Sequence, residues 1–329
     1  MTDTSVETPW DFGESISVPF QLPGHYGRRI IIWTSALMLL LTAAIVLLAW
    51  PIIKNLIPTF MAIAKNPDSP ETVFAIMGAY LQFGALFSVA GLLSLVLLSS
   101  AEASMLAAYL RGDVKQGIPL RFDGDMWRVI GARLLVGLLV GGAIFCIYVV
   151  ILLILFGTLA VFGSGATSGA GMVAMSLLPL IVIIAFICIS IWLSVRLSPF
   201  AAVAVRDRLF SLGDGWRVSK GRVLPMIGGF VILFIILAIA QNVLMYGGFF
   251  AVAGASGVFS MGDQFQNAAT PGEALDLLKS MVNPLVITIG ALVLILLTVL
   301  GVIGRLCIAG VSAHAAKLDA GPKQIADVF

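Results

Sequence analysis

Six uninterrupted apolar runs constrain the fold of this 329-residue chain more than any other feature. They cover approximately residues 30–50, 72–98, 134–162, 172–195, 223–250 and 284–304. Each run has about the 20 residues, or more, that a helix needs to cross a hydrocarbon layer roughly 30 Å thick. Backbone polar groups in lipid must be satisfied within the segment, and the strands of a barrel would alternate in polarity. The sequence therefore predicts an all-α integral membrane protein with about six transmembrane helices.

The composition excludes a soluble domain. Hydrophobic residues make up 60% of the chain and charged residues 11%, whereas soluble domains carry about 25% charged residues. The first 29 residues include Asp3 and Glu7 and contain no apolar core, which argues against a signal peptide. We expect a polar N-terminal tail at 1–29, a six-helix transmembrane domain at 30–305 and a C-terminal tail at 306–329.

Lys and Arg are distributed unevenly between the two sides that these runs define. Sixteen of the 19 basic residues lie in the tails and in the second and fourth connections, and three lie on the other side. Cytoplasmic segments of membrane proteins carry the excess of positive charge. Both termini are therefore predicted to be cytoplasmic, in a multi-pass protein.

A short motif is repeated 89 residues apart. It reads Gly124-Asp125-Met126-Trp127-Arg128-Val129 and then Gly213-Asp214-Gly215-Trp216-Arg217-Val218, each time just before an apolar run. We interpret the chain as three pseudo-repeated hairpins, each preceded by a short amphipathic interfacial helix. On the opposite face, Thr270-Pro271-Gly272-Glu273 resembles a capping box and predicts a further short amphipathic helix.

Tryptophan and basic residues of the two motifs form the first candidate site. An indole at the level of the lipid headgroups, flanked by cations, anchors a helix end and contacts anionic lipid. The cluster is therefore either a set of interfacial anchors or a binding site for lipid headgroups or an unknown protein partner. Its members are Trp127, Arg128, Arg206, Arg208, Trp216, Arg217, Lys220 and Arg222.

A charged residue stands at the inner end of each returning apolar run. These residues are Glu102, Arg196 and Arg305. They either extend to the headgroups or, if the hairpins pack around a common axis, pair as an ion cluster that closes the bundle.

Polar residues within the runs are few. Gln82, Gln241 and Asn242 either form hydrogen bonds between helices or line a polar cavity. No ionisable residue lies in the middle of a run, where ion-coupled transporters usually place one. The sequence contains no HExxH, nucleophile-elbow or P-loop motif, and we predict no catalytic residue, cofactor, metal or nucleic-acid partner.

The stretch from Arg196-Leu197-Ser198-Pro199-Phe200 to Trp216-Arg217-Val218-Ser219-Lys220-Gly221-Arg222 resembles a pattern in uncharacterised bacterial inner-membrane proteins. It is also similar to the membrane domain appended to some glycerophosphoryl diester phosphodiesterases. Pro199, Trp216, Ser219, Lys220 and Gly221 match, whereas Gly215 replaces the usual Ser and no second Trp follows. The resemblance implies a helical domain of the bacterial inner membrane and transfers no catalytic residue.

Together these patterns favour a non-catalytic inner-membrane protein that organises the membrane or envelope, or that binds lipids or a protein partner. A transporter or permease subunit for an apolar or amphipathic solute is the first alternative. A membrane-embedded lipid enzyme is the second.

Overall fold

The computed structural model of the chain describes residues 10–65, 70–162, 169–257 and 283–326, and within these ranges it contains helices and no strand. Six long helices dominate it: α2 (Tyr26–Lys65), α3 (Pro70–Arg111), α4 (Gly124–Phe162), α5 (Gly169–Leu197), α8 (Val223–Ser256) and α11 (Pro284–Ala326). Each contains a stretch that is long and apolar enough to cross a membrane. The prediction of an all-helical protein with six candidate spans is confirmed. The predicted helix after Thr270 lies outside the described residues.

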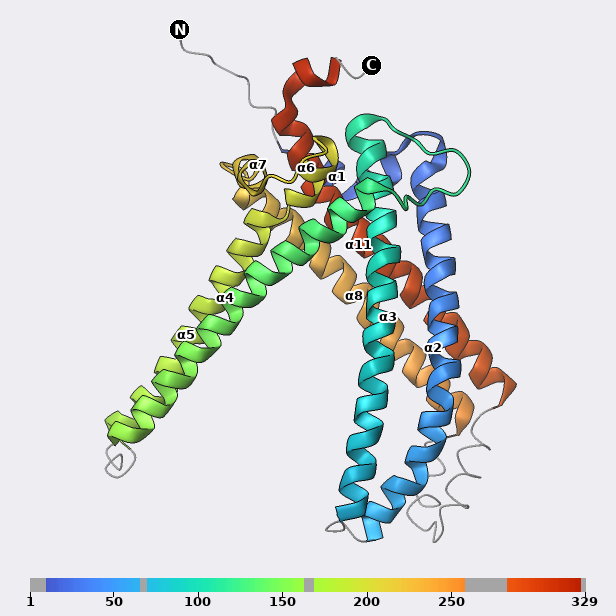
Figure 1. Cartoon of the computed structure of the whole chain (residues 1–329), viewed down its shortest axis with the longest axis vertical. Coiled ribbons are helices and arrows are strands. Elements are labelled where there is room, and N and C mark those ends of the chain that lie inside the picture. The colour runs from blue at the N-terminus through green and yellow to red at the C-terminus, as the bar shows by residue number, and fades with distance from the viewer. Residues whose placement is uncertain (1–9, 66–69, 163–168, 258–282, 327–329) are drawn as a thin grey trace.

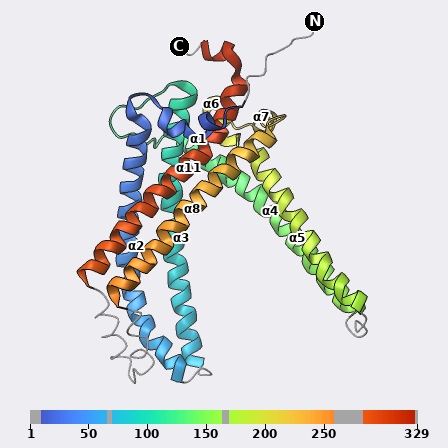
Figure 2. The ribbon, with the colours of Figure 1, turned by 180° about the vertical axis from the view of Figure 1, so that it is seen from behind.

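The long helices pair as three antiparallel hairpins, α2 with α3, α4 with α5, and α8 with α11 (Figure 1). All three hairpins meet at one end of the molecule, where α1 and the C-terminal end of α11 also lie. The α4/α5 hairpin then diverges from the other two, as both views show (Figures 1 and 2). Large apolar side chains on the diverging helices, such as Leu138 and Phe145 of α4, are exposed.

The meeting point is a buried core that we call the hub. It consists of residues 99–108 at the end of α3, the short helix α6 (Phe200–Arg206) that follows α5, and residues 306–316 of α11. These segments are rich in alanine, serine and glycine, and small side chains allow helix backbones to approach closely. One segment from each hairpin therefore contributes to a shared core.

Both predicted tails take part in this core. Residues 10–29 contain α1 (Phe12–Gln21) and the 3₁₀ turn η1 (Pro23–His25), and α1 packs against α11 and α8. Val18 of α1 is fully buried, and a Cβ atom added at Gly310 of α11 would lie 3.0 Å from the Cβ of Val18. Helix α2 runs from Tyr26 across residue 29, and α11 continues without a break past residue 305, so the predicted boundaries at 29 and 306 are not breaks in the fold.

Local signals explain where the short elements begin and end. The Asp11 carboxylate accepts a hydrogen bond from the Glu14 amide at 3.0 Å and caps α1. Ser211 caps α7 (Leu212–Val218) through the Asp214 amide at 3.3 Å. Pro199 lies between α5 and α6 and, because proline disfavours a continuous helix, it separates the span from the hub segment.

Candidate functional site

The first motif copy forms a buried ionic network at the start of α4. Asp125 is 5% exposed, and its carboxylate pairs with the guanidinium of Arg111 from the end of α3. The same carboxylate accepts a hydrogen bond from Arg128 Nη1 at 2.8 Å and lies 3.6 Å from Arg121 Nη1. Three arginines around one buried carboxylate hold the end of α3 against the start of α4.

Arg121 lies in the connection between α3 and α4 and links this network to two further carboxylates. Its Nη2 atom lies 2.6 Å from Asp113, and its Nη1 atom lies 3.4 Å from Asp123. Burial alone lowers the pKa of Arg121, but the neighbouring carboxylates raise it above its ordinary value. The side chain therefore stays charged and supports the network at all physiological pH values.

The second motif copy is more open. Asp214 pairs within its own helix turn with Arg217, at 3.5 Å, and the Arg217 side chain is 65% exposed. A second carboxylate, that of Asp319, lies 3.9 Å from Arg217 Nη2. Exposed pairs of this kind contribute about 0–1 kcal/mol because water screens them.

The tryptophan of the second copy carries an arginine on its ring. The guanidinium carbon of Arg196 lies 4.6 Å from the centre of the Trp216 ring, and Trp192 meets that ring edge-on at 5.6 Å. Trp216 is 38% exposed, and no ion pair joins Arg196 to a carboxylate in the described residues. Trp127 of the first copy is 62% exposed, and the described residues provide no ring partner for it.

The other predicted cations divide into bound and free groups. Arg206 contacts Asp207, Asp319 and the carbonyl oxygen of Ala316, so it is part of the hub. Three others make no ion pair within the described part of the chain: Arg208, Lys220 and Arg222. With Arg128 held by Asp125, the open part of the predicted lipid site is the second motif copy.

The predicted inner ion cluster forms with one different member. Glu102 is fully buried, and its Oε2 atom lies 3.6 Å from Arg305 Nη2, as expected for these two residues. The closer partner is Arg133 of α4, whose Nη2 atom lies 2.5 Å from Oε1. Arg196 contacts Trp216 instead, because the break at Pro199 separates the end of α5 from this cluster.

The sequence does not single out Arg133 as a partner of Glu102. Arg133 lies four residues beyond the end of the first motif copy, just before an apolar run, and resembles the other basic residues of the predicted cytoplasmic side. A buried glutamate requires a close cation. The need of a buried Glu102 for a close cation is therefore the one signal that could have pointed to Arg133.

Contacts across the hub connect the three hairpins in a cycle. Arg111 of α3 donates to the carbonyl of Val205 in α6 at 2.9 Å. Arg206 of α6 donates to the carbonyl of Ala316 in α11 at 2.6 Å. Lys317 of α11 contacts α3, since its ammonium lies 4.5 Å from the centre of the Tyr109 ring. Each hairpin thus contacts the next through a basic side chain.

A histidine lies in a shallow pocket beside α1. His314 is 3% exposed, its Nδ1 atom lies 3.4 Å from the Tyr109 hydroxyl, and Trp10 meets its ring edge-on at 5.0 Å. Glu14 is 3.9 Å from the same nitrogen. Spacing along the sequence gave no sign of this group, because its members come from α3, α11 and the N-terminal segment.

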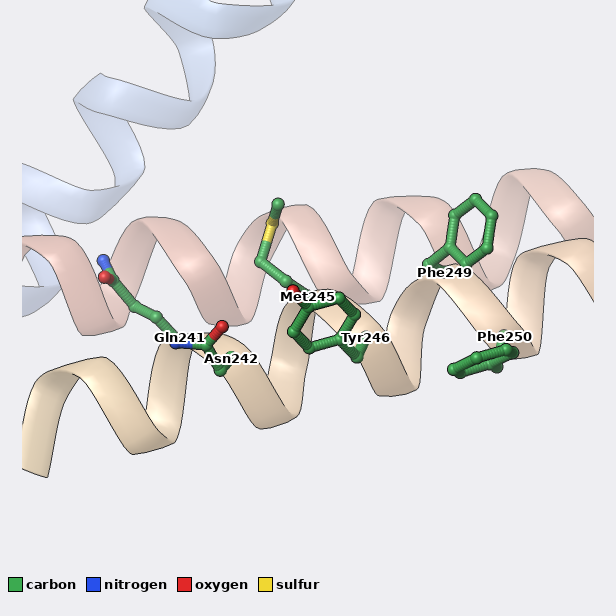
Figure 3. Close-up of a pocket in the computed structure, with 6 residues that line it drawn as sticks. All are labelled: Gln241, Asn242, Met245, Tyr246, Phe249 and Phe250. Atoms are coloured by element: carbon green, nitrogen blue, oxygen red, sulfur yellow. The ribbon is translucent and has the colours of Figure 1, made fainter. Parts of the chain in front are cut away.

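The predicted polar lining is split. Gln241 and Asn242 border a hollow of about 560 Å³, and its lining side chains within the described residues come from α8 (Figure 3). Asn242 Nδ2 donates to the carbonyl of Ala238 on its own helix at 2.7 Å. Gln82 of α3 is exposed and does not border this hollow.

The described residues contain no group of three or more His, Cys, Asp or Glu side chains suited to a metal ion. No family model matches the chain, and neither the curated proteins nor the solved structures contain a match. The resemblance to the phosphodiesterase membrane domain stays a prediction.

Proposed function

We propose that this chain is a non-catalytic inner-membrane protein that binds anionic lipid headgroups and organises the surrounding membrane. The binding surface is the second motif copy, with Trp216, Arg217, Lys220 and Arg222 beside Arg196. Its ligand is the negatively charged headgroup, and the three membrane-spanning hairpins hold this surface at the membrane.

One observation carries the proposal. The guanidinium of Arg196 lies over the exposed Trp216 ring, and no described carboxylate neutralises it. Arg217 and Lys220, which follow Trp216 in the sequence, are exposed as well. A cation held on an aromatic ring near the lipid headgroups is suited to a phosphate, which accepts hydrogen bonds from guanidinium groups.

The charge distribution supports the proposed location. The end of the molecule that holds the hub, both termini and most of the basic side chains is the cytoplasmic end in our proposal, since positive charge is retained on that side. The bacterial inner membrane follows from the sequence resemblance. We also infer that the hairpins are pseudo-repeats, and the cyclic contacts of Arg111, Arg206 and Lys317 support this inference.

The two tryptophans provide the test. Full-length Trp216→Ala and Trp127→Ala proteins are extracted from vesicles of phosphatidylglycerol and phosphatidylcholine, and the retained lipids are counted. We expect Trp216→Ala to lower the ratio of anionic to zwitterionic lipid roughly two- to fivefold, the effect of losing one cation–π contact. Trp127→Ala keeps the ratio. An equal effect of both changes, or none from Trp216→Ala, contradicts the proposal.

Transport of an amphipathic solute is the second candidate, because Gln241 and Asn242 border an otherwise apolar hollow. The described part of the lining belongs to a single helix, which favours a groove facing lipid over a passage between helices (Figure 3). Uptake of a labelled amphipathic solute into proteoliposomes that is lost in Gln241→Leu would favour transport over lipid binding.

A further inference from the structure

Three spans from different hairpins meet at one buried carboxylate. Glu102 of α3 is approached by Arg133 of α4 at 2.5 Å and by Arg305 of α11 at 3.6 Å. In the described residues no second carboxylate pairs with either arginine. Two guanidinium groups against one carboxylate leave a net charge of about +1 at this point.

Two buried hydrogen-bond donors of this group, the Nε atoms of Arg133 and Arg305, have no acceptor in the described residues. A guanidinium group has five N–H donors. Arg133 donates a hydrogen bond to Glu102, whereas Arg305 pairs with Glu102 at 3.6 Å and donates no hydrogen bond to a described residue. The Nε atoms of both arginines and Oε2 of Glu102 are buried without a hydrogen-bond partner. Buried donors without an acceptor are costly, so an anion that accepts from both arginines would be bound favourably.

The position of the cluster indicates which anion fits. It joins α3 to α11 and to α4, whose hairpin diverges from the other two (Figures 1 and 2). The Arg305 side chain is 34% exposed, so the cluster is accessible from outside the protein. Along α4, directly beyond Arg133, Leu134 and Leu138 are 59% and 72% exposed. A ligand that joins a phosphate to acyl chains matches both the charge and the apolar surface.

We propose that an anionic phospholipid binds at this junction, with its phosphate between Arg133 and Arg305 and its acyl chains along α4. The planar guanidinium matches phosphate oxygens in pairs. Glu102 orients Arg133 and limits the excess charge to one, which suits a single phosphodiester. The lipid would join α4 to α11 across the gap between hairpins. This inference rests on the proposed lipid-binding function for its ligand class, but its site is separate from the Trp216 surface.

Native mass spectrometry of the delipidated full chain, titrated with phosphatidylglycerol or phosphatidylcholine, tests the site. We expect Arg305→Gln to weaken retention of one phosphatidylglycerol about tenfold, as for the loss of one charge-assisted contact. Arg305→Lys keeps most of the affinity. Glu102→Gln strengthens it, because removal of the carboxylate raises the net positive charge.

Ligand binding predicts that Arg305→Gln and Glu102→Gln change the lipid affinity in opposite directions, which a purely structural role does not. If the cluster only stabilises the fold, Glu102→Gln and Arg305→Gln lower the unfolding temperature and neither changes lipid affinity, which overturns the inference. If Glu102→Gln does not fold, the comparison of Arg305→Gln with Arg305→Lys decides, since equal lipid affinities would refute a charge-based site. Displacement of the lipid by millimolar inorganic phosphate would assign the site to a soluble anion and also overturn it.

Arg217→Gln serves as the matched control. It lies in the Trp216 surface and is expected to leave the single lipid at Arg133 and Arg305 in place. An unchanged lipid count in Arg305→Gln, together with a reduced anionic ratio in Trp216→Ala, refutes this site and leaves the proposed function intact. No anionic preference in any variant refutes both.

Discussion

The two copies of the Gly-Asp-x-Trp-Arg motif begin two helices with the same pattern and have opposite environments. In the first copy, Asp125 is 5% exposed and pairs with arginines from α3, α4 and their connection. In the second, the Asp214 side chain is 39% exposed and pairs with Arg217 of its own helix turn. Trp216 holds Arg196 on its ring, whereas Trp127 projects from the surface with no ring partner in the described residues.

What the copies share is local, and what separates them comes from other hairpins. In both, an aspartate in the first turn pairs with an arginine three residues later, a geometry that suits a helix N-terminus. Arg111 arrives at the first copy from the end of α3. No arginine from another helix pairs with Asp214 in the described chain, so the ion pairs of the second copy stay exposed, with the Arg217 side chain 65% accessible. The motif therefore marks the start of a helix. Whether a copy is buried in the structure or exposed for binding depends on the residues that other helices place beside it.

The largest expected difference concerns the two aspartates. Asp125→Asn removes the buried carboxylate that Arg111 and Arg121 share and leaves them only the 45% exposed Asp113 in common, although their own side chains are 12% and 8% exposed. Loss of one partner from a buried ionic group costs about 3–5 kcal/mol. Asp214→Asn, in an exposed pair, costs about 0–1 kcal/mol. Unfolding of the purified full chain in detergent, followed by circular dichroism with increasing denaturant, measures both.

Equal destabilisation by the two changes would show that burial does not separate the copies. Arg111→Gln provides a control on the other side of the same ion pair. It removes the contacts to Asp125 and to the Val205 carbonyl, so it should destabilise as strongly as Asp125→Asn.

The middle position of the motif gives the next effect. Met126 is buried, and Met126→Ala creates a cavity that costs about 2–5 kcal/mol. At the equivalent Gly215, an added Cβ would lie 3.0 Å from the Cα of Phe200. Gly215→Ala therefore overpacks the contact of α7 with α6, at about 1–3 kcal/mol. The same unfolding assay checks both, and a stabilising Gly215→Ala would show that α7 can move away from α6.

The six spans could be predicted because lipid imposes a length and a polarity that a sequence displays directly. The hub could not, because its members look like loop or tail. Residues 306–316 are small and only mildly apolar, and they are buried because residues 101–108 and 200–205 pack on them. This burial depends on three segments that are far apart in the chain, so it cannot be predicted from the sequence of any one of them.

The candidate sites show the same limit. Charge at the end of each returning run suggests, as one of two alternatives, that Glu102, Arg196 and Arg305 pair, and Glu102 lies 3.6 Å from Arg305. Pro199 interrupts the helix after Arg196, which lies over Trp216 instead. Arg133 replaced it through the packing of α4 on α3, which the repeat pattern does not specify.

The smallest expected difference in stability concerns the motif arginines, and it separates the two roles most directly. Arg128 is one of three cations on Asp125, so Arg128→Gln should cost about 1 kcal/mol of stability. Arg217 is 65% exposed, and Arg217→Gln should cost less than about 0.5 kcal/mol.

Anionic lipid retention should respond in the reverse order, with the larger loss in Arg217→Gln, because a basic residue near a charged membrane surface contributes about 1 kcal/mol, or roughly fivefold in affinity. That effect should weaken as salt is added, since salt screens exposed charges over about 10 Å. If Arg128→Gln lowers lipid retention as much as Arg217→Gln does, both copies face the headgroups and the division between a structural and a binding motif is wrong.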